Sequence, residues 1–317
     1  MEFYLLIRGP ILLGEPALRP KLHEAGERLA ASAALDIEFK IISLKKLRQS
    51  ATSMFYYDLV CGHRWLIGTD ELLKDCGHHR DAGRIPLSEA ARLLMNRCSG
   101  LLFSAELLAR HKFDAADADF VGRNLAKAQL GFGDALLAAH GQYHWSCLER
   151  TARLNHLRCD PALPWIQSLR QHHAAGIEFK LHPIRSTESR ESLLARHAEL
   201  SALAEELWLW LESRRLGAHF RSPWQYASSR INKCPETHPV KNRLVNLRTF
   251  GPTALLRPSA SRYPRERLFH SLPLLLFEPA ALDQRAALRA VQGALQTNAS
   301  TFSELVQTYR RLWSRFN

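Results

Sequence analysis

The sequence predicts an α+β fold that is mostly α, with a small, incomplete mixed sheet near the N-terminus and a helical bundle after it. Three observations lead to this prediction. Residues 3–7 form an apolar run that ends at a Gly-Pro pair, as is typical of a buried strand. Residues 35–42 alternate apolar and polar side chains with the period of two of a strand. From Pro86 onward, apolar side chains recur instead at helical spacing.

The segment that joins the first two strands is expected to be a helix. Residues 20–35 are rich in Ala and carry apolar side chains at helical spacing, which indicates an amphipathic helix. Two further short segments, residues 58–60 and 65–67, flank Gly62. We expect these segments to be strands that close the small sheet.

Long helices are expected to dominate the rest of the chain. Leu87, Leu94 and Leu101 keep one helical face apolar, so a helix is predicted from Pro86, a residue that suits a first turn. A second helix is predicted over residues 117–139, apolar except for one narrow polar strip. The strip contains Asn124, Lys127, Gly131 and Asp134. Further helices are predicted over residues 144–157, 164–175, 188–216, 284–296 and 300–316, with residues 218–264 as a long ordered connection.

These patterns suggest three consecutive regions. Residues 1–84 are expected to form an α/β domain and residues 85–180 a helical bundle. Residues 181–317 are expected to form a helical C-terminal region whose role the sequence does not indicate.

The composition excludes several classes of protein. The 317 residues are 46% hydrophobic and 23% charged, which excludes an intrinsically disordered chain. The best candidate for a membrane span, residues 272–281, is short and contains two prolines and a glutamate. With Glu2 where a secretory signal would carry basic charge, we expect a cytoplasmic protein without a membrane partner. The net charge of +12 is spread along the chain, so we expect weak attraction to polyanions but no dedicated nucleic-acid module.

The order of the motifs resembles the nucleotidyltransferase superfamily, whose fold is shared by kanamycin nucleotidyltransferase and DNA polymerase beta. Residues 2–7 (Glu-Phe-Tyr-Leu-Leu-Ile) resemble the strand of the Asp-x-Glu pair, with Glu2 as the last acid of the pair. Residues 37–42 resemble the strand of the third acid, with Glu38 as the better candidate and Asp36 as the runner-up. Residues 57–68 resemble the closing strands of that domain. Residues 85–97 and 127–137 resemble the helical bundle, of the HEPN or kanamycin-nucleotidyltransferase C-terminal type, that often follows it.

The resemblance implies an active site with Mg²⁺ and a nucleoside triphosphate. Carboxylates in such enzymes hold two cations about 4 Å apart, which clamp the triphosphate and the attacking oxygen. The resemblance assigns metal binding to Glu2, Glu38 and Asp36, and catalysis to Glu38 and Asp36, with Glu38 also a candidate general base. It assigns nucleotide contacts to Lys127, Asp134 and Tyr143; these are the cofactor-binding residues we expect.

Two functions therefore remain open from the sequence. One is transfer of a nucleoside monophosphate from the triphosphate to an unknown acceptor. The other is a non-catalytic scaffold, a degenerate transferase that binds a nucleotide or a protein. The sequence lacks the Gly-Ser turn and the first Asp of the superfamily pattern, so we expect an N-terminally truncated chain. A homodimer formed through the helical bundle is compatible with either function.

Overall fold

The computed structural model describes residues 2–8, 11–33, 37–159, 162–256 and 258–317. Helices make up 71% of it, and its one sheet within these ranges has two parallel strands, which confirms the predicted α+β, mostly α class. The chain divides into two compact units, Met1–Ile85 and Pro86–Asn317, which we call unit 1 and unit 2. The sequence analysis placed boundaries after residues 84 and 180.

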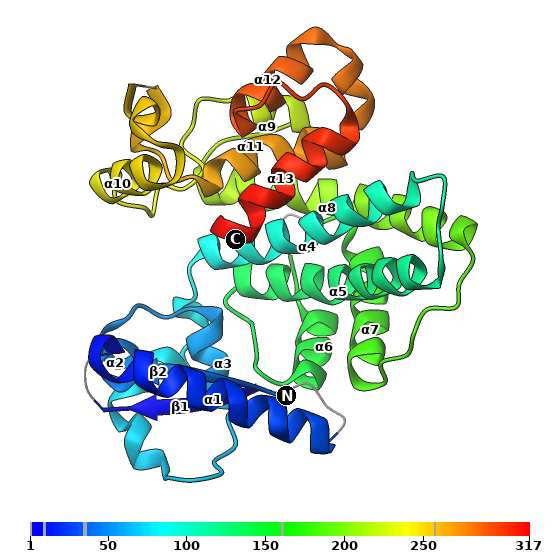
Figure 1. Ribbon diagram of the computed structural model, residues 1–317. Helices are drawn as coiled ribbons and strands as arrows, with labels where there is room; N and C mark the ends of the chain where they lie inside the picture. Colours follow the sequence, from blue (N-terminus) through cyan, green and yellow to red (C-terminus); the bar gives the residue numbers. More distant parts are fainter. Residues whose placement is uncertain (1, 9–10, 34–36, 160–161, 257) are drawn as a thin grey trace. The chain divides into compact units, whose positions relative to one another are not determined.

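Unit 1 is built on a β-α-β crossover. Strand β1 (Glu2–Ile7) leads through helix α1 (Ile11–Ala33) to strand β2 (Glu38–Ser43). The strands pair in parallel, and the register runs from Glu2 opposite Glu38 to Ile7 opposite Ser43 (Figure 1). Parallel strands need a connection long enough to return to the same end of the sheet, and α1 provides it. The sheet is parallel, whereas the sequence analysis expected a mixed one.

The rest of unit 1 is helical, which corrects the two strands expected around Gly62. Residues 58–60 lie inside helix α3 (Met54–Gly62), and residues 65–67 form no strand, since the chain bends at residues 66–68. Helix α3 begins where the Ser53 hydroxyl accepts a hydrogen bond from the Tyr56 amide, and it buries Tyr57 and Val60, three residues apart, on one face. The remaining elements are α2 (Leu44–Gln49) and two 3₁₀ helices, η1 (Asp70–Arg80) and η2 (Ala82–Arg84).

Unit 2 begins with the predicted helical bundle. Helix α4 (Leu87–Leu108) and helix α5 (Ala115–Ala139) form a hairpin, followed by α6 (Cys147–His156), α7 (Ile166–Leu181) and α8 (Arg190–Leu216). Helix α5 packs against α4, α7 and α8, and it is apolar on most of its circumference. The periodicity therefore predicted these five helices correctly to within a few residues.

The C-terminal third of unit 2 contains more helices than expected. Its elements are α9 (Pro223–Ser228), α10 (Pro239–Phe250), η3 (Pro252–Leu256), η4 (Pro258–Ser261), α11 (Arg265–Leu276), η5 (Pro279–Asp283), α12 (Arg285–Leu295) and α13 (Phe302–Phe316). The segment expected as a connection thus holds α9 and α10. Helix α13 packs on α4, where the buried hydroxyls of Ser99 and Tyr309 lie 2.7 Å apart and are hydrogen bonded. None of the described helices is long and apolar enough to cross a membrane.

Close packing of α7 on α5 depends on Gly176, because a Cβ there would overlap the backbone nitrogen of Leu130. We expect Gly176→Ala to lower the free energy of unfolding by about 2 to 3 kcal/mol, because α7 must move away from α5. Gly293→Ala in α12 is the matched control, since its Cβ would meet no atom within 4 Å. It should raise stability by up to about 1 kcal/mol through helix propensity. Urea unfolding of both variants tests this; equal effects would contradict the packing of α7 on α5.

Candidate functional site

Two carboxylates meet at the start of the sheet in unit 1. Glu2 and Glu38 are register partners on parallel strands, so their side chains project from the same face. The Lys40 ammonium joins them: its Nζ lies 2.7 Å from Glu2 Oε1 and 3.3 Å from Glu38 Oε2. The structure therefore brings together two of the three predicted metal ligands. The third, Asp36, lies outside the described residues.

The neighbours of Glu2 stabilise its ionised form. The Lys40 ammonium donates a hydrogen bond to one oxygen, and the Tyr4 hydroxyl donates to the other. The hydrogen bond from Lys40 is the largest cause that lowers the pKa of Glu2, and the hydrogen bond from Tyr4 lowers it further. The same contact with Glu2 raises the pKa of Lys40, so both groups remain charged at neutral pH.

The Lys40 ammonium occupies the position between the two carboxylates. The two carboxylates already converge on a single positive charge, that of Lys40. Mg²⁺ in nucleotide sites is commonly held by one or two carboxylates together with substrate phosphates. Among the described residues, no group of three or more His, Cys, Asp or Glu side chains could hold a metal. A magnesium site at Glu2 and Glu38 therefore remains a prediction, and the described residues do not form a two-metal site.

A hollow of about 340 Å³ lies beside this acidic pair. All six residues of β2 line the hollow. Their side chains alternate between the two faces of the strand, so the hollow runs along the edge of β2 that does not pair with β1. Its other walls are Arg19 and Leu22 from α1, Lys46 from α2, and Phe55 and Tyr56 from α3. Three cationic side chains (Arg19, Lys40 and Lys46) and three aromatic rings (Phe39, Phe55 and Tyr56) therefore line a space of the size that small ligands occupy.

The predicted nucleotide contacts belong to unit 2, where Lys127 is exposed on α5. Partial burial is the main cause that lowers the pKa of Lys127, and the charges of Arg97 and Arg123 lower it further. Lys127 is therefore part of a group of like charges, which is an arrangement that attracts anions. A phosphate contact of Lys127 remains a prediction.

Asp134 and Tyr143 lie together in the interior of the bundle. Arg150 Nη1 donates to Asp134 and also to the Tyr143 hydroxyl, at 3.3 Å from the latter. The His173 ring lies 3.3 Å from the other Asp134 oxygen. All four side chains are buried, and a buried ion pair of this kind is costly to break. The contacts in this cluster link α5, α6 and α7. The polar strip of α5 therefore contributes, at Asp134, to the packing of these helices.

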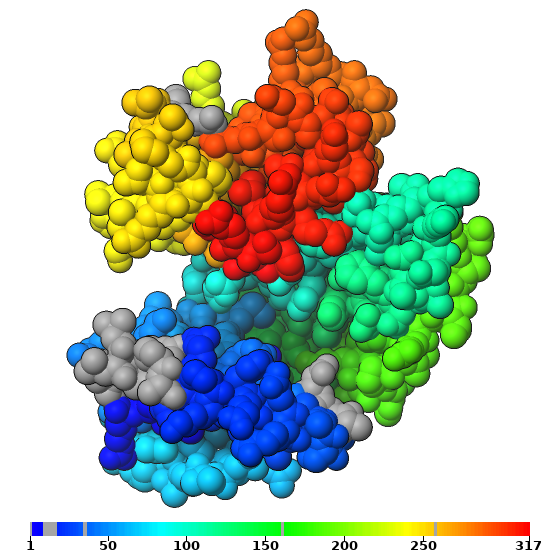
Figure 2. Space-filling view, in the orientation of Figure 1, coloured from blue at the N-terminus to red at the C-terminus, as the bar shows by residue number. Residues whose placement is uncertain are grey.

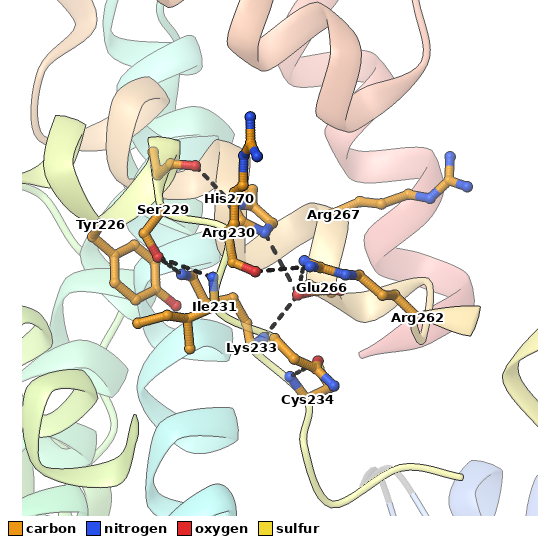
Figure 3. Close-up of polar contacts among 12 residues, drawn as sticks. Tyr226, Ser229, Arg230, Ile231, Lys233, Cys234, Arg262, Glu266, Arg267 and His270 are labelled. Atoms are coloured by element: carbon orange, nitrogen blue, oxygen red, sulfur yellow. Dashed lines mark hydrogen bonds and ion pairs between the residues drawn. The ribbon is translucent and has the colours of Figure 1, made fainter. Parts of the chain in front are cut away.

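A second buried polar network was not predicted from the sequence. Glu212 accepts hydrogen bonds from Arg215 and from the Tyr226 hydroxyl. Glu266 accepts from the Lys233 amide and from Arg262 at 2.8 and 2.9 Å (Figure 3). The sequence did contain one signal for this network. Glu212 follows Trp208 by four residues, so the glutamate lies on the apolar face of α8. The network joins α8, α9 and α11, and its carboxylates are occupied by internal donors.

The hollow beside β2 was also not predicted from the sequence, because its cationic and aromatic walls come from three separate helices.

Comparisons of this chain with protein-family models, with curated proteins and with solved structures found no match. The geometry of the described residues is therefore the basis for the proposals below.

The Lys233 amine gives a pH-dependent stability that can be measured. Lys233 is fully buried, and burial lowers its pKa to about 8 from 10.5. Between these two values the unfolded chain binds the proton and the folded chain does not, so stability rises with pH in this window. Relative to Lys233→Met, which lacks the group, the wild type should gain about 2 kcal/mol between pH 7 and pH 9.5. Urea unfolding at both pH values measures this difference, and a difference independent of pH would contradict it.

Proposed function

We propose that the chain is a nucleotidyltransferase-type protein whose unit 1 binds a nucleoside triphosphate and Mg²⁺ and transfers a nucleoside monophosphate to an acceptor. One observation supports this most strongly. Glu2 and Glu38, which the resemblance assigns to metal binding, come from segments more than 30 residues apart in the sequence and are register partners in the sheet. The resemblance places the acids on neighbouring strands, and β1 and β2 are neighbours.

The residues around the acidic pair have complementary roles in this proposal. Glu2 and Glu38 hold Mg²⁺, which when bound withdraws charge from phosphate oxygens. Arg19 and Lys46 line the hollow and neutralise phosphate charge. Phe55 is partly exposed there and offers a ring on which a base can stack. Lys40 balances the two carboxylates in the absence of a divalent cation.

Proton transfer needs a base near the acceptor hydroxyl. Glu38 is the candidate, because its carboxylate lines the hollow and is solvent accessible. Deprotonation of the acceptor by Glu38 prepares the oxygen that attacks the α-phosphorus, and pyrophosphate is the leaving group.

A second candidate is a nucleotide-binding protein without transfer activity. The observation that favours it is the pair of acids among the described residues, where the superfamily pattern uses three. A pair can hold Mg²⁺ with a triphosphate, whereas two cations require more ligands.

Titration calorimetry with Mg²⁺ and each of the four common nucleoside triphosphates tests the proposal. We expect Glu2→Gln and Glu38→Gln each to weaken binding at least about tenfold, because each removes a charged ligand. Glu71→Gln is the matched control: this glutamate of unit 1 is exposed on η1 and pairs only weakly with Lys74. Its binding should equal that of the wild type.

A pyrophosphate-release assay with a small-molecule extract as the acceptor source separates the two candidates. Release that Glu38→Gln abolishes supports transfer. Binding without release supports the second candidate. Equal binding by the wild type and both site variants would overturn the assignment of nucleotide binding to Glu2 and Glu38, and no binding by the wild type would overturn both functions.

A further inference from the structure

Helix α10 of unit 2 has its apolar side outside and its polar side inside. Asn242 and Asn246 are 3% and 1% exposed, whereas Val240 and Leu244 on the opposite side are 69% and 48% exposed. A surface helix of a soluble protein normally has the reverse orientation. The orientation of α10 is therefore inverted, with apolar side chains toward solvent and asparagines toward the protein interior.

Hydrogen bonds of the two asparagines give the structural explanation. Asn246 Nδ2 donates to the carbonyl oxygens of Ala260 and Arg262, at 3.0 and 2.8 Å. Asn242 Nδ2 donates to the carbonyl oxygen of Ser261 at 2.9 Å. These bonds satisfy carbonyls of the returning chain and would be lost if the helix turned over. The outward position of Val240 and Leu244 is thus built into the fold.

Helix α10, η3 and η4 form a lobe, residues 239–261, which we call the α10 lobe. Helix α10 packs against η3 and η4, and the lobe stands out from unit 2 in Figures 1 and 2 (yellow). Its anchor on α11 is largely polar: Arg267 lies over the Phe250 ring at 4.0 Å. Arg262, just after the lobe, pairs with Glu266 in the network of Figure 3.

The exposed apolar side chains of the α10 lobe are aliphatic and adjacent. Val240 and Leu244 are four residues apart on one face of α10. Leu255 and Leu256 on the neighbouring η3 are 41% and 86% exposed. The lobe thus carries four exposed aliphatic side chains on two elements that pack against each other, and such a group of exposed apolar side chains is typical of an interaction site.

Positive charges flank the apolar stripe on both sides. By helical spacing, Lys241 and Arg248 lie on one flank of the stripe and Arg243 lies on the other, and all three are exposed. Residues 237–265 contain six Lys or Arg and no Asp or Glu. The surface is therefore complementary to a partner that is negatively charged over its whole face.

We propose that the α10 lobe binds the surface of an anionic lipid bilayer, with Val240, Leu244, Leu255 and Leu256 inserted at the level of the head groups. An apolar stripe flanked by Lys and Arg on both sides is the pattern of a helix that lies in the membrane interface. Hot spots of protein interfaces are enriched in Trp, Tyr and Arg, whereas Leu and Val are under-represented there, and single-stranded nucleic acids stack on aromatic rings. The exposed apolar side chains of α10 and η3 are aliphatic, which favours lipid over both.

This proposal changes the expectation that no membrane takes part. That expectation rested on the absence of a membrane-spanning segment, and a peripheral lobe needs none. The inference is independent of the nucleotide site, because it concerns residues of unit 2 alone.

Co-sedimentation with vesicles tests the proposal on the full chain. Vesicles of phosphatidylcholine with 30% phosphatidylglycerol, a composition chosen as the probe, should bind the protein, and vesicles of phosphatidylcholine alone should not. The chain carries +12 overall, so charge alone gives some binding, and the decisive variant keeps every charge. Val240→Ser with Leu244→Ser should lower the partition coefficient at least about tenfold.

Two further variants complete the test. Ile184→Ser is the matched control, since Ile184 is 74% exposed in unit 2 but lies outside the lobe; its binding should equal that of the wild type. Replacing Lys241, Arg243 and Arg248 by Gln should lower partition roughly 100-fold, about fivefold for each charge near an anionic surface. Circular dichroism verifies that each variant is folded.

Equal partition of the wild type and the Val240→Ser, Leu244→Ser variant would overturn the proposal. A loss of partition in Ile184→Ser as large as that of the double variant would also overturn it. Binding of an acidic amphipathic peptide with no binding to vesicles would also overturn it, in favour of a protein partner.

Discussion

The parallel pairing of β1 with β2 is the constraint on which the candidate site depends. Because α1 returns the chain to the same end of the sheet, both strands start together, and each starts with a glutamate. Two carboxylates at adjacent strand positions repel each other unless a cation lies between them. Lys40, two residues after Glu38 on the same face of β2, supplies that cation within the chain. A slip of one residue in the register would move Glu2 to the other face relative to Glu38 and Lys40 and separate these charges.

The sequence predicted the elements whose side-chain pattern is set by burial. Strands β1 and β2, and helices such as α5 and α8, have faces that must be apolar, so their periodicity is visible in the sequence. The pairing of Glu2 with Glu38 followed from the family resemblance, and the register places them opposite each other. Helix α3 was missed because Asp58, Leu59 and Val60 also fit a short strand, and the cap at Ser53 decides between the two structures.

Other features could not be predicted from the sequence because they depend on contacts between distant segments. Helix α10 has no apolar inner face, and its orientation is set by asparagine contacts with residues 260–262. The hollow beside β2 takes Arg19, Lys46 and Phe55 from three helices, so no local pattern reveals it. The sequence shows Asp134 as a polar residue on a mostly apolar helix. Its ion pair with Arg150 depends on the packing of α6 on α5, which no local pattern reveals.

The central claim is that Glu2 and Glu38 together form a cation site. Electron paramagnetic resonance of free Mn²⁺, titrated with the full chain, measures this directly, since bound Mn²⁺ loses its sharp signal. A nucleoside triphosphate chelates Mn²⁺ by itself, so a parallel titration with a non-hydrolysable triphosphate is corrected for the depletion that the triphosphate alone causes. The site predicts that the wild type depletes free Mn²⁺, and that Glu2→Gln and Glu38→Gln do so at least about tenfold more weakly. Depletion that is the same in the wild type and in both variants would contradict the site.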